Sequence, residues 1–196
     1  ALRLRHDRDV VRVLADRDAL TNVLNRRGWT ERVNTLLSAG TAQPMALLFL
    51  DLDHFKLLND RQGHNTGDRA LVAVANALTA ELRPGDLFGR YGGEEFVALL
   101  DNTRPEQAMH VATRLCRRVH RLEIPVNAEA LLSISIGVTI RHHDDDVESL
   151  VERADQAMYN AKLNGRNQVC MYGTSMPMDT PATPRLHVVE KRGGNN

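Results

Sequence analysis

The stretch Arg90-Tyr91-Gly92-Gly93-Glu94-Glu95-Phe96 decides how the rest of the chain can fold. Adjacent glycines weaken helices and strands alike, because each adds conformational freedom to the unfolded chain. They are typical of a tight turn, or of a place where a ligand approaches the backbone. An apolar run, 96–100, follows directly. We therefore expect a hairpin whose turn, 91–94, lifts carboxylates to the edge of a sheet.

The two acids of this turn repel each other, so a cation or a bound proton is their natural partner. A surface turn with two solvated acids explains this segment alone equally well. A second acidic strand end favours the first interpretation. Residues 45–53, Met-Ala-Leu-Leu-Phe-Leu-Asp-Leu-Asp, predict a buried strand with Asp51 and Asp53 at its C-terminal end. Open α/β sheets bind their ligands at that end of their strands.

Two acidic clusters on neighbouring strands are what a divalent metal site for phosphoryl transfer requires. Carboxylates hold Mg²⁺, and the metal is shared with the phosphates of the substrate. Lys56, Lys162 and Arg166 are candidates to bind the outer phosphates. Taken singly, each of these three is more simply explained as an ordinary surface charge.

A loop rich in hydrogen-bonding side chains lies between the two acidic clusters, at Asn59-Asp60 and 63–68. A carboxylate such as Asp68 can accept two N–H bonds from the edge of a guanine, and an amide such as Asn59 can bond the same ring. Asp68 could instead do no more than cap the helix that follows it. The two functions are compatible, and the sequence leaves both open.

The composition is that of a globular domain, with 25 basic and 25 acidic residues among 196. A formal net charge of zero argues against a nucleic-acid-binding protein. No apolar run reaches 18 residues and no signal peptide is visible, which favours a cytoplasmic location. Cys116 and Cys170 lack metal-ligand spacing, so two reduced thiols are expected. Because the chain starts at Ala1, a longer, membrane-linked protein remains an alternative.

The periodicity predicts an α+β fold in which a mixed central sheet carries helices. We divide the chain into a lead-in helix that signals or dimerises (1–17), one catalytic domain (18–172) and a disordered tail (173–196). The predicted helices are 30–38, 68–82, 106–121 and 147–163, with a short helix and loop over 54–65. The predicted strands are 45–53, 87–88, 96–100, a central strand at 131–140 and an edge strand at 168–172.

Several further motifs follow one another along the chain between Asp18 and Val169. They are Asp18-Ala-Leu-Thr…Leu24-Asn-Arg-Arg27, Asp51-Leu-Asp-His-Phe-Lys56…Asn59-Asp60, Gly63-His64…Gly67-Asp68, Ser135-Ile-Gly-Val138, Ala154-Asp155…Met158-Tyr159…Ala161-Lys162 and Gly165-Arg-Asn167. Together with Gly92–Phe96 they make the chain resemble the catalytic domain of diguanylate cyclases, the GGDEF family, in its Gly-Gly-Glu-Glu-Phe form. Asn22 stands where that family usually has glycine, a change that we expect Asn to tolerate.

The resemblance implies a palm-like, nucleotidyl-cyclase-like domain that binds one GTP. Two such domains face each other, and each 3′-hydroxyl attacks the α-phosphate of the other nucleotide, which yields cyclic di-GMP and two pyrophosphates. The implied metal ligands are Asp51, the Leu52 carbonyl and Glu94, for Mg²⁺ or alternatively Mn²⁺. Glu95 supports the metal or the attacking hydroxyl, so that Asp51, Glu94 and Glu95 are the catalytic residues. The implied GTP-binding residues are Asn59 and Asp68 for guanine, and Phe55, Lys56, His64, Lys162 and Arg166.

The resemblance also implies a product-inhibition site at Arg83-Pro84-Gly85-Asp86, an RxxD motif, with Arg114 as its helper. Cyclic di-GMP bound there would slow turnover. An ordinary helix end with surface charges is the alternative. The loop 142–146, His-His-Asp-Asp-Asp, is better explained as a solvated loop than as a metal site, because no partner cluster accompanies it.

Two other functions remain open at this point. The domain could hold GTP or cyclic di-GMP and report it to a protein partner without turnover, although such a receptor would not need Asp51 and Glu94. Another metal-dependent nucleotidyl cyclase or a polymerase-palm enzyme is also conceivable, but the chain lacks a long basic face. An upstream sensor or a protein partner acting through the lead-in helix is expected to control activity.

Overall fold

The computed structural model describes residues 15–40, 43–122 and 132–173. Its elements, in chain order, are β1 (Leu24–Asn25), α2 (Arg26–Ser38), β2 (Ala46–Leu52), α3 (Phe55–Gln62), α4 (His64–Glu81), β3 (Leu87–Arg90), β4 (Glu95–Leu100), α5 (Pro105–His120), β5 (Ile134–Ile140), α6 (Val147–Leu163) and β6 (Val169–Met171). Within these residues, no helix is both long and apolar enough to cross a membrane.

The strands form one mixed sheet with the order β1-β3-β4-β2-β5-β6. The central strand, β2, is antiparallel to β4 on one side and to β5 on the other. The outer pairs β1–β3 and β5–β6 are parallel. All seven residues of β2 are buried, as expected for a strand with neighbours on both sides and helices on both faces.

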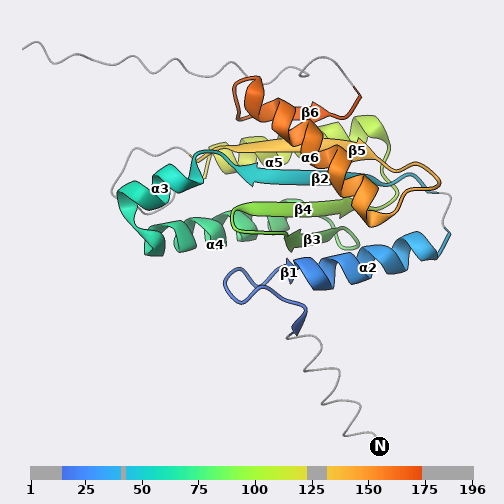
Figure 1. The fold of residues 1–196 in the computed structure, drawn as a ribbon, viewed down its shortest axis with the longest axis horizontal. Helices are drawn as coiled ribbons and strands as arrows, with labels where there is room; N and C mark the ends of the chain where they lie inside the picture. Colours follow the sequence, from blue (N-terminus) through green and yellow to red (C-terminus); the bar gives the residue numbers. More distant parts are fainter. Residues whose placement is uncertain (1–14, 41–42, 123–131, 174–196) are drawn as a thin grey trace, which may run out of the picture.

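Helices cover both faces of the sheet, and alternate residues of β2 point to each (Figure 1). Leu48 and Leu50 pack with the apolar sides of α4 and α5. Leu47 and Phe49 pack with α2 and α6, which lie on the opposite face. The predicted α+β architecture with helices on a mixed sheet is therefore confirmed.

Several predicted elements match the structure closely. The helix predicted over 147–163 has those bounds, and the strand predicted at 168–172 forms β6 at the edge of the sheet. Asn22 has a φ of +58°, the left-handed conformation that Asn adopts more readily than most residues. Most of the predicted lead-in helix lies outside the described residues, which begin at residue 15. The predicted tail also lies outside them, apart from Gly173.

Two helices begin four residues earlier than the sequence suggested. Helix α2 starts at Arg26, because the side chain of Asn25 accepts a hydrogen bond from the Gly28 N–H at 2.9 Å and so caps the helix. Helix α4 starts at His64 and includes Gly67, a residue that disfavours helices. The two-residue strand β1 was not predicted, because it is defined only by its pairing with β3.

Candidate functional site

The glycine-rich segment forms the turn of the β3–β4 hairpin, as predicted. The Tyr91 N–H donates to the Glu95 carbonyl at 2.8 Å, and the Glu95 N–H donates to the Gly92 carbonyl at 3.3 Å. The Glu95 carboxylate folds back over Gly92, where an added Cβ would lie 2.7 Å from Glu95 Oε2. A side chain at position 92 would therefore displace this carboxylate.

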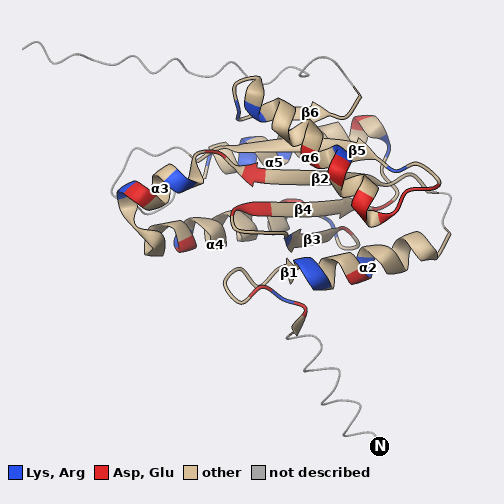
Figure 2. Ribbon diagram, in the orientation of Figure 1, with Lys and Arg blue, Asp and Glu red and all other residues tan. Residues whose placement is uncertain are grey.

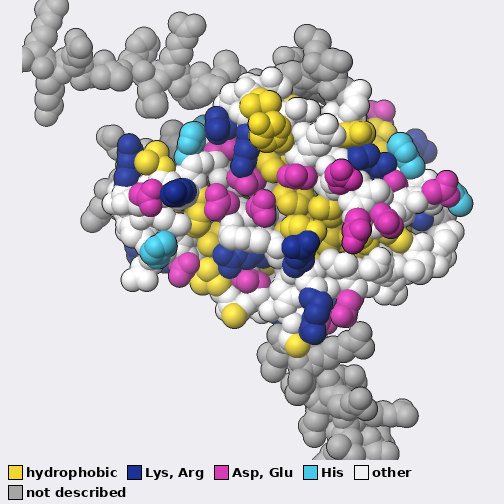
Figure 3. All heavy atoms as spheres, viewed as in Figure 1, with side chains coloured by type: hydrophobic (Ala, Val, Ile, Leu, Met, Phe, Trp, Pro, Cys, Tyr) yellow, Lys and Arg dark blue, Asp and Glu magenta, His cyan; other side chains and the backbone are white. Residues whose placement is uncertain are grey.

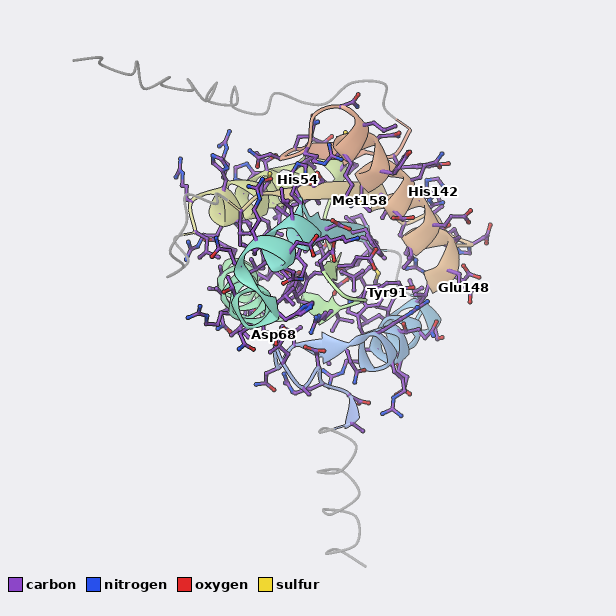
Figure 4. The ribbon with its side chains drawn as sticks, turned by 60° about the vertical axis from the view of Figure 1, so that its left-hand side comes forward. His54, Asp68, Tyr91, His142, Glu148 and Met158 are labelled. Carbon is purple, nitrogen blue, oxygen red and sulfur yellow. The ribbon has the colours of Figure 1, made fainter. Side chains whose placement is uncertain are left out.

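Two side chains next to the turn hold it in place. The Arg90 guanidinium donates to the Gly93 carbonyl through Nε (3.0 Å) and Nη2 (2.7 Å), and its Nη1 pairs with Asp18 at 3.1 Å. The Tyr91 ring lies between the hairpin and α2 (Figure 4). It makes edge contacts with Trp29 and Phe49. These contacts fix the direction in which the turn carries its acids.

The acidic end of β2 lies directly beside this turn. Asp51 is opposite Glu95 in the β2–β4 register, and the Leu52 N–H donates to the Glu94 carbonyl at 3.3 Å. Figure 2 shows the acidic ends of β2 and β4 next to each other. In the space-filling view of the same face, acidic and basic side chains intermingle around these ends (Figure 3). The structure therefore brings the two predicted acidic clusters together.

Lys162, in the last turn of α6, contacts this cluster. Its Nζ lies 2.8 Å from Asp51 Oδ1, and both side chains are largely buried. This contact with a positive charge offsets part of the cost of burying the Asp51 carboxylate.

The electrostatic environment disfavours the charged form of all three acids. Burial raises the pKa values of Asp51, Glu94 and Glu95. The negative charge of Asp51 raises the pKa values of both glutamates further, and Lys162 opposes this effect. The negative charge of Asp155 also raises the pKa values of Asp51 and Glu95. The cluster thus has an excess of negative charge that a cation would relieve.

The residues present fit a hard divalent cation. Among the described residues, no group of three or more His, Cys, Asp or Glu side chains is arranged to hold a metal ion by itself. The predicted set of ligands requires only two carboxylates, from Asp51 and Glu94, with the Leu52 carbonyl. Mg²⁺ commonly takes one or two carboxylates and completes its shell with water and substrate phosphates. The burial of Asp51 and the repulsion between Asp51 and the two glutamates are consistent with such a site.

Asp53 differs from Asp51, although it is only two residues away. Its Oδ1 accepts from the Ser135 hydroxyl at 2.7 Å, and its Oδ2 accepts from the Ser133 hydroxyl at 2.7 Å and from the Asn167 N–H at 3.0 Å. The side chain is buried, at 5% exposure. Both oxygens of Asp53 are therefore occupied by the protein itself.

The two predicted guanine-binding residues lie on adjoining helices. A Cβ on Gly67 would collide with Asn59 Oδ1, so the Asn59 amide, on α3, lies directly against the backbone of α4 beside Asp68. Asn59 Oδ1 is buried and has no hydrogen-bond partner. Asp68 is exposed on α4, well separated from His142 (Figure 4). Helix α4 is capped by Gly63, so the alternative that Asp68 serves as its cap is wrong.

The other predicted GTP-binding residues occupy helix ends. Phe55 is the first residue of α3, and its ring is buried in the core, which leaves its backbone N–H as the group able to bind a ligand. Lys56 is exposed in the same turn, and His64 is exposed at the start of α4. Arg166 is exposed in the loop after α6, with a φ of +63°.

Asp155 is a neighbour of the acids that the sequence reasoning did not single out. It precedes Lys162 by seven residues on α6, which is two helical turns, and so lies on the same face of that helix. This seven-residue spacing was the feature of the sequence that could have identified Asp155 as a neighbour of the acidic cluster. The pairing of Arg90 with Asp18 was also missed, because 72 residues separate the two.

The three predicted inhibitory-site residues line one hollow of about 500 Å³, together with Thr103 and His110. Arg83 Nε lies 3.2 Å from Asp86 Oδ1, and the Arg83 guanidinium also donates to Thr103 Oγ1 at 2.7 Å. Arg114, on α5, pairs with Glu81 at 2.9 Å. Asp86 directly precedes β3, so this hollow lies at the opposite end of the hairpin from the glycine-rich turn.

The acids of the 142–146 loop are used within the loop and by α6. Asp145 pairs with Arg153, which holds the pKa of that carboxyl below its usual range despite partial burial. The Asp146 side chain caps α6 by accepting from the Ser149 N–H at 2.8 Å. His143 and Asp144 are almost fully exposed. These contacts agree with the interpretation of a solvated loop.

Comparison with known families and proteins points to one group. Residues 15–168 match the family model described as "Diguanylate cyclase, GGDEF domain". A diguanylate cyclase of Vibrio cholerae is 37% identical over 165 residues, which are 83% of this chain and 51% of the relative. Diguanylate cyclase A of Treponema denticola is 39% identical over 150 residues, 75% of this chain and 40% of the relative. The chain thus spans about half the length of the curated relatives it matches.

Solved structures give the same result. The coiled coil and GGDEF domain of DgcB from Caulobacter crescentus, in complex with c-di-GMP, matches with a TM-score of 0.81 and 28% identity, covering 86% of this chain and 92% of that one. The diguanylate cyclase SiaD of Pseudomonas aeruginosa, in complex with its activator SiaC, matches with a TM-score of 0.77 and 38% identity, covering 86% and 67%. The active GGEEF domain of a Vibrio cholerae diguanylate cyclase matches with a TM-score of 0.71 and 35% identity, covering 77% and 98%.

Proposed function

The chain belongs to the GGDEF family of diguanylate cyclase domains, and from this premise we propose that it condenses two GTP molecules into cyclic di-GMP and two pyrophosphates. The observation that carries the proposal is the juxtaposition of Asp51, Glu94 and Lys162 at adjoining strand and helix ends. Phosphoryl transfer depends on positioning and on neutralising phosphate charge, and this cluster has groups suited to both.

Each charged residue of the cluster then has a definite part in binding GTP. Asp51, Glu94 and the Leu52 carbonyl hold Mg²⁺, which neutralises phosphate charge when bound. Lys162 lies close enough to Asp51 to contact a phosphate bound at the same place. Lys56, Arg166 and the backbone N–H of Phe55 bind the outer phosphates, and His64 lies beside them at the start of α4. Glu95, next to the metal ligands, orients the attacking 3′-hydroxyl or supports the metal.

The guanine ring binds between α3 and α4. Asn59 contributes an amide whose buried oxygen lacks a partner in the protein, and Asp68 contributes an exposed carboxylate. A carboxylate that accepts two N–H bonds selects guanine over adenine, because adenine lacks the matching donors. A buried polar group left unpaired by the wrong base adds to this discrimination.

One domain holds one GTP, so the reaction requires a second copy facing the first. Pairing two domains turns a reaction between two bound nucleotides into an effectively intramolecular one, which is where the proximity advantage arises. We propose that the segment before Asp18 controls this pairing. Two relatives support the idea: the DgcB structure pairs a coiled coil with the GGDEF domain, and SiaD is seen with an activator. Because GTP is a cytoplasmic metabolite, we place the domain in the cytoplasm.

The direct test is to incubate the protein with GTP and Mg²⁺, identify products by chromatography and repeat the assay with Glu94→Ala. The expected result is cyclic di-GMP from the parent and a loss of at least about 100-fold in the variant. Asp144→Ala, which removes a carboxylate that is 99% exposed, is the matched control and keeps full activity.

Other outcomes separate the alternatives. If the parent binds GTP but forms no product, even after fusion to a coiled coil that enforces dimers, the domain is a silent binding module. A different cyclic or linear nucleotide product would indicate another nucleotidyl cyclase.

We further propose that cyclic di-GMP inhibits the enzyme through Arg83, Asp86 and Arg114. All three line the hollow at the far end of the hairpin. Arg83→Ala should raise the concentration of cyclic di-GMP needed for half-inhibition by at least about 10-fold, the equivalent of one charge-assisted hydrogen bond. Arg117→Ala is the control, because Arg117 is on α5 like Arg114 but lines only the adjoining hollow. Equal inhibition of parent and Arg83→Ala would refute the proposal.

A further inference from the structure

Three consecutive residues after α6 have positive φ angles. They are Gly165 (+113°), Arg166 (+63°) and Asn167 (+47°). Glycine adopts such angles freely, but a side chain makes them unfavourable, and Arg is not among the residues enriched there. A backbone of this kind persists only where the surrounding structure holds it. The turn also carries Arg166, one of the proposed phosphate-binding residues.

The strongest fixed partner of this turn is the carboxylate of Asp53. The Asn167 N–H donates to Asp53 Oδ2 at 3.0 Å, and Asp53 is itself fixed by the Ser133 and Ser135 hydroxyls at 2.7 Å each. A hydrogen bond to a buried carboxylate is stronger than one between neutral groups. The Arg166 N–H donates to the Ala161 carbonyl at 3.0 Å, which joins the turn to α6.

The two acids at the end of β2 therefore hold the C-terminal end of α6 at two points. Asp51 pairs with Lys162, and Asp53 binds the backbone of Asn167. In the proposed function, Asp51 binds Mg²⁺ and Lys162 binds a phosphate, so substrate weakens the first contact. The second contact involves no group that binds substrate in the proposed function.

We propose that Asp53 is a positioning residue that holds the 165–167 turn, and with it Arg166, in the geometry that binds the GTP phosphates. This inference rests on the proposed function. Asp53 is not a metal ligand, since both of its oxygens already accept hydrogen bonds from the protein. The two acids of the segment Asp51-Leu52-Asp53 thus have different roles. Asp51 binds the metal, and Asp53 positions the residues that bind the phosphates.

The test exploits a difference between asparagine and alanine at position 53. Asparagine can replace all three contacts, because its oxygen can accept from Ser133 and Asn167 while its amide donates to the Ser135 oxygen. Alanine replaces none. A metal ligand would not tolerate asparagine in this way, because the negative charge is lost with either substitution.

The measurement is equilibrium binding of a non-hydrolysable GTP analogue by calorimetry, as a function of Mg²⁺ concentration and also in EDTA. Asp53→Ala should weaken binding about 10-fold under both conditions, the loss of one phosphate contact. Asp53→Asn should stay within about 3-fold of the parent, with an unchanged Mg²⁺ midpoint. Asp144→Ala, which removes a carboxylate that is 99% exposed, is the control and should stay close to the parent. In an Arg166→Ala background, Asp53→Ala should cause almost no further loss, because both changes remove the same contact.

Several results would overturn the proposal. One is additive losses from Asp53→Ala and Arg166→Ala, and another is a shifted Mg²⁺ midpoint in Asp53→Asn. Should Asp53→Ala fail to fold, a 10-fold loss of affinity in Asp53→Asn decides against the proposal by itself. If the parent does not bind the GTP analogue, the proposed function fails as well. If the parent binds it and Asp53→Ala binds it equally well, only the present inference fails.

Discussion

Individual carboxylates at the hairpin are held in surroundings that disfavour their charge. Asp51, Glu94 and Glu95 all have raised pKa values, chiefly because they are partly buried. The charge of Asp51 also raises the pKa values of the two glutamates, and Asp53 and Asp155 raise that of Asp51. A group whose pKa is higher in the folded protein than in the unfolded chain destabilises the fold when it is ionised. The ionised acids therefore lower the stability of the fold, as expected if the proposed cation site has been kept at the expense of stability.

The first prediction concerns Glu94→Gln in metal-free protein. At pH 7 this variant should melt about 1–3 °C above the parent, because a charge held in unfavourable surroundings is gone. The raised pKa means that the parent regains this stability as pH falls and Glu94 takes up its proton. The difference in melting temperature should therefore shrink between pH 7 and pH 4. Thermal unfolding at several pH values measures it.

Glu152→Gln, at an exposed position of α6, is the control for this prediction and should show no such gain. Saturating Mg²⁺ should also reduce the difference between Glu94→Gln and the parent, by stabilising the parent more. A difference that grows toward acid pH would contradict the account of the acidic cluster.

Gly67 is a single residue that keeps Asn59, a proposed guanine-binding residue, in place. Its hydrogen leaves space for Asn59 Oδ1, and an added methyl group would collide with that oxygen. The second prediction is that Gly67→Ala raises the KM for GTP by at least about 10-fold, because Asn59 is pushed out of position. Steady-state kinetics at saturating Mg²⁺ measures the change.

Asn76→Ala, at an exposed position on the same helix, is the control. Both substitutions favour helix formation, but only Gly67→Ala should affect GTP. An unchanged KM in Gly67→Ala would show that Asn59 does not need this position to bind guanine.

At the scale of elements, the site depends on how closely α6 lies on the sheet. Gly137 of β5 allows this contact, because a Cβ there would collide with the Ala154 carbonyl and the Met158 N–H of α6. These are backbone atoms, which cannot move without moving the helix. Lys162 lies in the last turn of this helix and the 165–167 turn follows it, so the distance of α6 from the sheet sets the position of the proposed phosphate-binding residues.

The third prediction is that Gly137→Ala lowers the free energy of unfolding by about 1–3 kcal/mol or more, as overpacking does. It should also raise the KM for GTP, because Lys162 moves away from Asp51. Urea denaturation gives the stability. Gly93→Ala is the control for stability, because a Cβ on Gly93 meets nothing within 4 Å. Equal stability of Gly137→Ala and the parent would contradict this prediction, because it would mean that α6 can move away from the sheet at no cost in stability.

At the scale of the molecule, the sites lie at opposite ends of the β3–β4 hairpin. The acidic cluster adjoins the turn, and the hollow lined by Arg83, Asp86 and Arg114 adjoins the other end. A ligand in that hollow does not touch the acidic cluster of the same domain. A product molecule that inhibits from this hollow must therefore change either the pairing of two domains or the conformation of the β3–β4 hairpin, which joins the two sites.

The fourth prediction follows from the proposal that two domains must face each other for the reaction. At low protein concentration, the specific activity should rise with concentration, because the fraction of paired domains rises. Fusing a dimeric coiled coil before Ala1 should raise the activity and remove most of this dependence. Initial rates over a wide range of dilution measure the effect. Specific activity that is independent of concentration, in a protein that sedimentation shows to be monomeric, would contradict it.

Much of the fold was accessible to sequence reasoning, because its elements carry strong local signals. Helix α6 has a clear apolar period and an Asn164-Gly165 ending, and both of its bounds were predicted. The starts of α2 and α4 were missed. In α2, the Asn25 cap lies among other turn-forming residues. In α4, Gly67 lies inside the helix although glycine has a low helix propensity, because the tertiary contact with Asn59 outweighs that propensity.

The order of residues alone specifies the chemical groups and their approximate places: two acids at a strand end, two at a glycine turn, and basic residues near helix ends. Which of those groups is free to bind depends on the folded structure. Asp51 and Asp53 are alike in the sequence, and alternate residues of a strand share one face. Yet Asp53 is occupied by Ser133, Ser135 and Asn167, which lie 80, 82 and 114 residues away along the chain. Contacts over such separations form only when the sheet closes, so no local pattern records them.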